Sequence, residues 1–218
     1  VNTTGLVSVD GCEEQPLKGL LLNSSLIDRL ISDLSNLNMY DCHIVHISSA
    51  GIYGNSHTNK PWKESDITSP ISVYGNTKLL GEFLTLTHKG PATVLRSDFY
   101  GINPYSEKSL LWWIIKNASI GETMDGWENI HFSPISAQQL AKIIGKIING
   151  KVAGIFNVGC LDDCNKYNFV NEVCSNLSLK ANVVKTSLVD DSIRPNYAIV
   201  DSKKIYDIFD CGLVWQED

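Results

Sequence analysis

Segments with helical periodicity alternate with short apolar runs along this chain. Between Pro16 and Leu37 apolar residues recur at three- and four-residue steps, which predicts a long amphipathic helix. Further helices are predicted at 73–88, 110–119, 136–149, 167–177 and 201–209. Strands are predicted from the apolar runs at 43–47, 92–96 and 154–158, and from 182–187. This alternation is typical of an α/β domain with a largely parallel sheet and right-handed crossovers.

Polar and glycine residues stand where the predicted strands end. Ser48 and Ser49 follow the first strand, and Gly101 and Gly159 lie after later ones. Ligands of parallel sheets bind beyond the carboxyl ends of the strands. Ser72 suits the N-cap of the helix that follows the polar loop after Ser49. We therefore expect a ligand site between this first strand and that helix.

Composition narrows the class of protein. The chain has 218 residues, of which 43% are hydrophobic, so it can bury a substantial core and is not disordered. A net charge of −6 argues against nucleic-acid binding, and the lack of an apolar run near the ~20 residues that a span needs argues against a membrane protein. The six cysteines show no zinc-site spacing, so we expect reduced thiols, no metal and a cytoplasmic protein.

The most informative stretch is Ser72-Val-Tyr-Gly-Asn-Thr-Lys78. Tyr74 and Lys78 are four residues apart, so they project from one face of a helix. A phenol with its usual pKa near ~10 exchanges protons poorly at neutral pH, and a neighbouring ammonium lowers that pKa. Ser49, at a strand end, is placed to hydrogen-bond a substrate carbonyl that Tyr74 protonates. Alone, a Tyr-x-x-x-Lys spacing is weak, because both residues are common on solvated helix faces.

The surrounding sequence resembles the extended short-chain dehydrogenase/reductase family. The resemblance rests on a serine-ended strand, the turn Ile52-Tyr53-Gly54, an acidic and proline-containing loop, and Tyr74 and Lys78. Tyr74 follows Ser49 by 25 residues, which fits that family. Further segments that resemble this family are Val1-Asn2, Val9-Asp10, Cys12-Glu13, Val94-Leu95-Arg96 and Ser133-Pro134-Ile135. Arg194-Pro195 and Asp201–Lys204 resemble the tail of its dTDP-4-dehydrorhamnose reductase branch. The resemblance therefore covers nearly the whole chain.

This resemblance implies a Rossmann-like, doubly wound parallel sheet with a small C-terminal substrate lobe. The implied divisions are 1–104 with 134–160 for the nucleotide-binding part, and 105–133 with 161–218 for the lobe. The family's Gly-rich turn for the cofactor pyrophosphate has no counterpart here, and the match starts at the family's fourth strand. We therefore expect the sheet to be N-terminally incomplete and this chain alone to bind NAD(P) weakly or not at all.

The implied activity is reduction of a nucleotide-activated 4-keto-6-deoxysugar with NADPH or NADH. Tyr74 is then the proton donor, with Lys78 and Ser49 as its catalytic partners. Cofactor contacts are implied for Asn23, Ser48, Tyr74 and Lys78; Asn23 has the alternative role of tying down the backbone.

Arg194 stands where relatives contact the substrate diphosphate, with an ordinary surface-loop arginine as the alternative. By contrast, Arg29 is expected to be solvated and Arg96 to pair structurally.

Departures from the family leave other activities open. Ala50-Gly51 after Ser49 lack the acid pair of a dehydratase. Ser97-Asp98-Phe99 replace the Asn that sugar epimerases usually carry, which favours a reductase over an epimerase without excluding the latter. For Asp98 we expect a capping or solvated loop role, with a position facing the cleft as the alternative. A third possibility is a non-catalytic subunit that binds a partner enzyme; a homodimer is equally compatible with the sequence.

Overall fold

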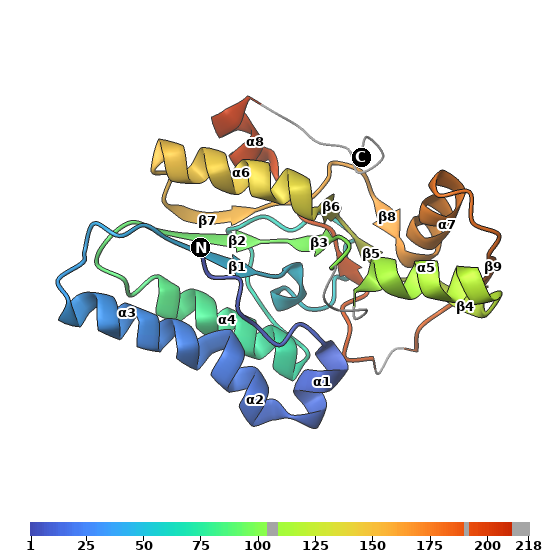
Figure 1. Cartoon of the computed structure of the whole chain (residues 1–218), viewed down its shortest axis with the longest axis horizontal. Coiled ribbons are helices and arrows are strands. Elements are labelled where there is room, and N and C mark those ends of the chain that lie inside the picture. The colour runs from blue at the N-terminus through green and yellow to red at the C-terminus, as the bar shows by residue number, and fades with distance from the viewer. Residues whose placement is uncertain (104–108, 190–191, 211–218) are drawn as a thin grey trace.

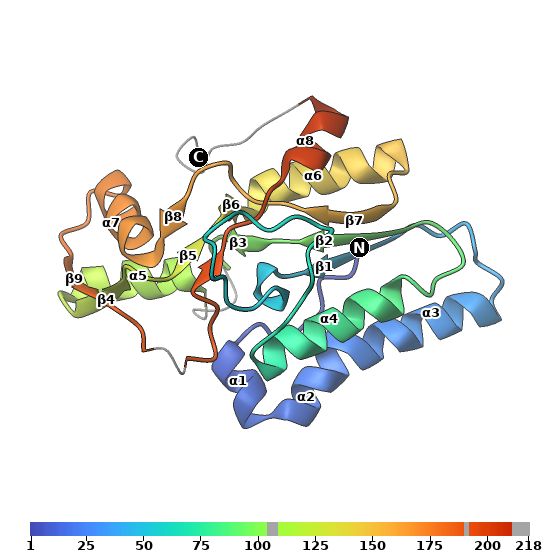
Figure 2. The ribbon, with the colours of Figure 1, turned by 180° about the vertical axis from the view of Figure 1, so that it is seen from behind.

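The computed structural model describes residues 1–103, 109–189 and 192–210. At its centre is a parallel three-stranded sheet in the order β1-β2-β7. These strands are β1 (Ile44–Ser48), β2 (Ala92–Arg96) and β7 (Gly154–Asn157). Helices α3 and α4 cover one face of this sheet, and α6 and α8 cover the other (Figure 1; Figure 2). The doubly wound arrangement predicted from the sequence is confirmed, and the predicted strand positions hold to within one residue.

The first face of the sheet is covered by the predicted long helix, which has three parts. They are α2 (Pro16–Leu20), the π-helical η1 (Leu21–Ser25) and α3 (Leu26–Asn36). Ile27, Ile31 and Leu34 of α3 pack with Ile44 of β1. Helix α4 (Val73–Thr85) lies beside α3 in both views. The sequence pattern does not predict the π-turn, because the hydrogen bonds of the buried Asn23 come from distant segments.

The opposite face of the sheet is covered by α6 (Ala137–Gly150) and α8 (Lys203–Phe209). A reciprocal capping box starts α6, since Ser136 Oγ accepts from the Gln139 amide at 3.1 Å and Gln139 Oε1 accepts from the Ser136 amide at 3.3 Å. Ile143 and Ile147 pack against Leu95 of the sheet. The capping and the apolar stripe together explain why this helix is predictable from its sequence.

A second group of elements lies beyond one end of the sheet (Figure 1). It contains α5 (Leu110–Ile120), α7 (Lys166–Asn176) and the parallel pair β4 (Thr123–Trp127) and β9 (Asn182–Thr186). Ile114, Met124 and Phe169 form its core, and Ala50 and Ile52 next to the sheet belong to the same cluster. The expected boundary between residues 104 and 105 lies outside the described residues.

Several short elements were not predicted. They are α1 (Val9–Glu14), the 3-10 helix η2 (Ala50–Ile52), β3 (Asp98–Tyr100), β5 (His131–Phe132), β6 (Pro134–Ser136), β8 (Cys164–Asn165) and β10 (Tyr197–Ala198). The longer strand β4, which pairs with the predicted β9, was not predicted either. β3 pairs with β6, and β5 lies between β10 and β8. Strands of two or three residues are too short to show a period, so only their tertiary partners define them.

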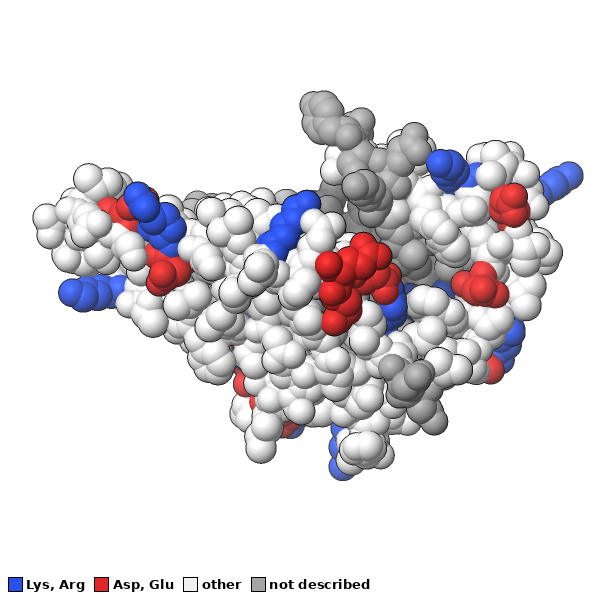
Figure 3. Space-filling view, turned by 90° about the horizontal axis from the view of Figure 1, so that it is seen from below, with Lys and Arg blue, Asp and Glu red and all other residues white. Residues whose placement is uncertain are grey.

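The face seen in Figure 3 is mostly uncharged, with scattered basic and acidic side chains and one larger acidic group near its middle. Asp10, Glu13 and Glu14 of α1 are exposed, as are Leu17 of α2 and Leu30 of α3. In the described ranges we find no helix long and apolar enough to cross a membrane.

Candidate active site

Helix α4 is held close to the end of β1 by its cap and its glycines. Ser72 Oγ accepts a hydrogen bond from the Gly75 amide at 3.0 Å, which starts the helix. A Cβ at Gly75 would lie 2.9 Å from the Gly51 carbonyl oxygen, and one at Gly81 would lie 2.3 Å from the Asn23 carbonyl oxygen. Both positions therefore require glycine for α4 to approach η2 and η1 this closely.

Ser49 lies directly after β1 and joins two other side chains of the site. It is buried, and its hydroxyl donates to Asp98 Oδ1 at 3.0 Å. Its oxygen also accepts from the Gly51 amide at 3.1 Å, and it is hydrogen-bonded to the Tyr74 phenol. The structure thus brings two of the three predicted catalytic residues, Ser49 and Tyr74, into contact.

Lys78 lies one helical turn after Tyr74 and is buried. Its Nζ donates to the Ile47 carbonyl oxygen of β1 at 2.6 Å. Burial lowers the pKa of Lys78 to about 8, although the charges of Glu82 and Cys12 act in the opposite direction. An ammonium has three donors, so two remain for a ligand.

The environment of the Tyr74 phenol differs from the sequence expectation. Burial of the hydroxyl raises its pKa above the ordinary value, and the charges of Asp98 and Cys12 raise it further, whereas the Ser49 hydrogen bond lowers it. The expectation of a net lowering by Lys78 is wrong for this structure. The physical reason is that burial and nearby negative charge dominate, while the ammonium is hydrogen-bonded to Ile47.

Asn23 and Ser48, both predicted to contact a cofactor, are buried in different surroundings. Asn23 Oδ1 accepts from the Leu6 amide at 2.8 Å, and Nδ2 donates to Thr77 Oγ1 at 2.9 Å. The amide therefore ties the N-terminal segment to α4, which was the alternative expectation. Within the described residues, Ser48 Oγ has no hydrogen-bond partner.

The three arginines occupy different environments. Arg194 is paired with Asp10 of α1, and its guanidinium lies over the Trp127 ring at 5.7 Å from the centroid. Arg29 is exposed and pairs with Asp33, as expected for a solvated residue. Arg96 forms a buried ion pair with Glu82 at 2.8 Å, which confirms its structural role. Arg194 therefore links the loop before β10 to α1.

Two further charged residues complete the site. Asp98 follows β2, and its carboxylate accepts from Ser49 and from the Ala50 amide, so the expected solvated loop role is wrong. Lys166, the first residue of α7, lies with Nζ 3.4 Å from the Phe132 ring centroid. Burial lowers its pKa to about 8, against the opposing charge of Asp98. The sequence could have indicated Asp98 as a site residue, because it follows the carboxyl end of a strand that neighbours β1. No such feature of the sequence indicated Lys166.

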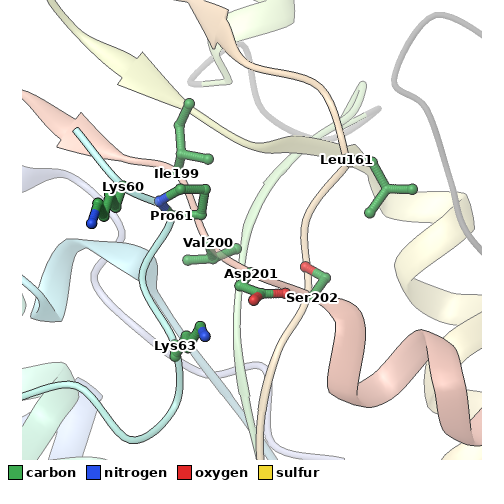
Figure 4. A pocket seen from close by; sticks show the side chains of 8 residues that line it. All are labelled: Lys60, Pro61, Lys63, Leu161, Ile199, Val200, Asp201 and Ser202. Atoms are coloured by element: carbon green, nitrogen blue, oxygen red, sulfur yellow. The ribbon is translucent and has the colours of Figure 1, made fainter.

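A surface pocket of about 320 Å³ lies elsewhere (Figure 4). Its lining includes Lys60 and Lys63 from one loop and the segment 199–202, rather than Ser49, Tyr74 or Lys78. Among the described residues, no group of His, Cys, Asp or Glu side chains has the arrangement of a metal site. Ser49, Tyr74 and Asp98 form a separate side-chain cluster at the end of β1, with Lys78 one helical turn after Tyr74.

Comparison with known proteins identifies a family that covers the whole chain. The sequence model of a family described as the RmlD substrate binding domain matches residues 1–218. The chain is 23% identical to the probable low-salt glycan biosynthesis reductase Agl14 of Haloferax volcanii, over 89% of this chain and 65% of that protein. It is 26% identical to the methionine adenosyltransferase 2 subunit beta of Rattus norvegicus, over 90% of this chain and 60% of that protein. In both alignments the chain spans less than two thirds of the relative's length.

Solved structures with the same fold include two dTDP-4-dehydrorhamnose reductases. The Clostridium acetobutylicum structure has a TM-score of 0.87 at 22% identity, covering 99% of this chain and 76% of that one. The Bacillus anthracis structure, solved in complex with NADP, has a TM-score of 0.86 at 19% identity, with coverage of 99% and 76%. At these identities the similarity establishes the Rossmann-type fold.

Proposed function

This chain belongs to the RmlD substrate binding domain family, and from that premise we propose its function. We propose that it carries the catalytic and substrate-binding residues of an NAD(P)-dependent reductase. Its substrate is a nucleotide-activated 4-keto-6-deoxysugar, as in dTDP-4-dehydrorhamnose reductases. The observation that supports this best is the contact of Ser49 with Tyr74 at the end of β1, with Lys78 one turn away. NADPH or NADH is the cofactor that such chemistry requires.

Two features of the site fit a nicotinamide cofactor. Ser48 has a buried hydroxyl without a partner among the described residues, and Lys78 keeps two free donors. We assign these two groups to the hydroxyls of the nicotinamide ribose. Asn23 supports this cradle by fixing Leu6 and Thr77 through its amide. The bound cofactor supplies a hydride to the sugar carbonyl carbon.

Tyr74 acts as the proton donor to the carbonyl oxygen. A raised pKa keeps the phenol protonated in the free site, which is the form that reduction needs. The Ser49 hydroxyl rotates from Asp98 towards the carbonyl oxygen when substrate binds, since a serine O–H turns about a single bond. Lys78 holds the ribose and stabilises the phenolate that remains after proton transfer.

The substrate is bound between the two parts of the fold. Residues 1–104 and 134–160 form the nucleotide-binding part, and 105–133 and 161–218 form the substrate lobe. Arg194 of the lobe then contacts the diphosphate and exchanges its Asp10 partner for it. A guanidinium suits this role because it binds phosphate oxygens in bidentate fashion.

A cytoplasmic location agrees with the state of the cysteines. Within the part of the chain that the structure describes, the thiols of Cys12, Cys164 and Cys174 are buried and form no disulfide. Free thiols of this kind persist in a reducing compartment.

The test is NADPH-dependent reduction of a dTDP- or UDP-linked 4-keto-6-deoxysugar, followed by the loss of NADPH absorbance at excess cofactor. Tyr74→Phe should lower kcat at least about tenfold, because a proton donor of this kind contributes ~10²-fold or more. Tyr40→Phe is the matched control, since it removes a hydroxyl that, among the described residues, donates to the Ser35 carbonyl oxygen at 3.4 Å and lies outside the Ser49–Tyr74 cluster. A loss smaller than tenfold in Tyr74→Phe would refute the catalytic assignment.

A second candidate is a non-catalytic subunit, which the similarity to a methionine adenosyltransferase subunit favours. In that case the protein co-purifies with a partner enzyme, and Tyr74→Phe leaves the complex unaffected. An epimerase would instead convert the sugar without net consumption of NADPH. Loss of NADPH absorbance therefore identifies the reductase, and analysis of the sugar product in the same reaction separates an epimerase, which converts the sugar, from a non-catalytic subunit, which leaves it unchanged.

A further inference from the structure

Asp98 brings a carboxylate to the site from β3, an element separate from helix α4, which carries Tyr74 and Lys78. It begins β3, directly after β2, and β2 is the parallel neighbour of β1. Its Oδ1 accepts the Ser49 hydroxyl at 3.0 Å, and the Ala50 amide is a second donor to it. Ser49 in turn is hydrogen-bonded to Tyr74, so the carboxylate is one side chain away from the phenol.

The groups that face Tyr74 differ in the sign of their effect. The Ser49 hydroxyl lowers the pKa of the phenol when it donates to the Tyr74 oxygen, whereas Asp98, which takes that hydrogen in this structure, and the buried thiol of Cys12 raise it. Lys78, on the same helix face, directs its ammonium to Ile47. Lys166 approaches from α7 and favours the charged form of Asp98, with Arg194 as a further cation close to Lys166. Burial is the largest effect on Asp98 and raises its pKa, whereas Lys166 on the lobe side and the donors Ser49 and Ala50 act to keep its carboxylate charged.

We propose that Asp98 is a positioning residue that commits this site to carbonyl reduction, by placing its carboxylate against Ser49 and so keeping the Tyr74 phenol protonated. This inference rests on the proposed function for the reaction, but its electrostatic content concerns residues of this chain alone. It assigns to Asp98 a direction-setting role beyond the Ser49, Tyr74 and Lys78 set.

The direction follows from the proton balance. In reduction the carbonyl carbon takes a hydride from the nicotinamide, the C=O π bond opens onto oxygen, and that oxygen takes the Tyr74 proton. The phenolate left behind regains a proton from water. Alcohol oxidation, the first step of an epimerase, needs the phenolate beforehand, to take the hydroxyl proton. A carboxylate beside the phenol favours the first direction and opposes the second.

The test titrates the phenol in the whole chain without cofactor or substrate. Replacing the eight tyrosines with 3-fluorotyrosine makes each phenol more acidic and gives each a fluorine signal, and Tyr74→Phe identifies the Tyr74 signal. We expect Asp98→Asn to lower the pKa of this phenol by about one unit or more, because a like charge is removed. The asparagine keeps acceptors for Ser49 and Ala50, so the fold is expected to persist, which circular dichroism checks.

Two variants make the result specific. Asp33→Asn removes the same charge from the exposed pair with Arg29 on α3 and should leave the Tyr74 titration unchanged. Asp98→Glu restores a carboxylate and should restore the high pKa. Equal Tyr74 titrations in the unmodified chain and in Asp98→Asn would overturn the proposal.

An activity measurement separates this inference from the proposed function. In the reductase assay, Asp98→Asn should shift the alkaline limb of the kcat profile for reduction to lower pH, together with the phenol titration. If Asp98→Asn shifts the titration but no reduction occurs, the proposed function is wrong and the electrostatic assignment stands. If reduction occurs and its pH profile is the same in Asp98→Asn, the direction-setting role is wrong.

Discussion

His46 shows how burial alone determines the charge of a residue in this chain. It is fully buried in β1, and its Nδ1 is 3.0 Å from Asn2 Nδ2. Burial lowers the pKa of His46 to about 3, and the charge of Lys78 lowers it further. The imidazole is therefore neutral throughout the range in which an unfolded histidine gains a proton.

This low pKa predicts a specific loss of stability in acid. Between pH 6.5 and pH 3 the unfolded chain binds a proton at His46 that the folded chain does not, so stability falls as pH falls. The loss from pH 7 to pH 4.5 should be about 2.5 kcal/mol, at 1.36 kcal/mol per pKa unit. His46→Gln should remove this part of the acid dependence, as urea unfolding at several pH values will show. Parallel pH dependences in both proteins would contradict the prediction.

At the residue scale, the sequence identified Ser49, Tyr74 and Lys78 because their spacing matches a helical period and a strand end. It did not show that the Asp98 carboxylate and the buried thiol of Cys12 would lie near the phenol and raise its pKa. Those residues lie far from Tyr74 in sequence, and only the packing of β3 and α1 near α4 brings them close. The direction of the pKa change in Tyr74 was therefore beyond prediction from local spacing.

At the scale of elements, the close contact of α4 with η1 depends on Gly81, because glycine has no side chain. A Cβ at Gly81 would lie 2.3 Å from the Asn23 carbonyl oxygen and 3.0 Å from His46 Nε2. Because the first neighbour is backbone, the helices must separate to accept it. The same contact aligns Asn23 with Thr77, next to Lys78.

Gly81→Ala should therefore destabilise the chain, by about 1–3 kcal/mol as for other overpacked sites. Gly145→Ala is the matched control, since Gly145 lies within α6 and a Cβ there would meet no atom within 4 Å. That change should stabilise by up to about 1 kcal/mol through helix propensity. Thermal or urea unfolding of the two variants decides the matter; similar effects in both would show that the α4–η1 approach is not tight.

At the scale of the whole molecule, Arg194 and Asp10 connect the C-terminal part with the N-terminal helix α1. Figure 1 shows α1 below the sheet, next to the loop that carries this arginine. Asp10 is 60% exposed, and exposed ion pairs contribute little to stability. The position of the pair thus suits ligand binding better than it suits the folding of the chain.

Arg194→Gln should accordingly change the free energy of unfolding by less than about 1 kcal/mol. If Arg194 contacts the diphosphate as proposed, the same variant should raise the Kd for the nucleotide sugar several-fold or more, because a charge-assisted, bidentate contact is lost. Isothermal calorimetry with dTDP-sugar measures the second effect and urea unfolding the first. An unchanged Kd would show that Arg194 does not contact the diphosphate and is an ordinary surface arginine.

Local sequence patterns were sufficient to predict the long helices and strands and to single out Ser49, Tyr74 and Lys78. Apolar periodicity, the Ser72 and Ser136 caps and the Tyr74–Lys78 spacing are local, so they can be read along the chain. The tertiary structure alone decided the short strands β3, β5, β6, β8 and β10, the π-turn at Asn23, and the neighbours of each titratable group. These depend on contacts between segments far apart in sequence, where burial and the charge of Asp98 outweigh the local effect of one lysine on one tyrosine.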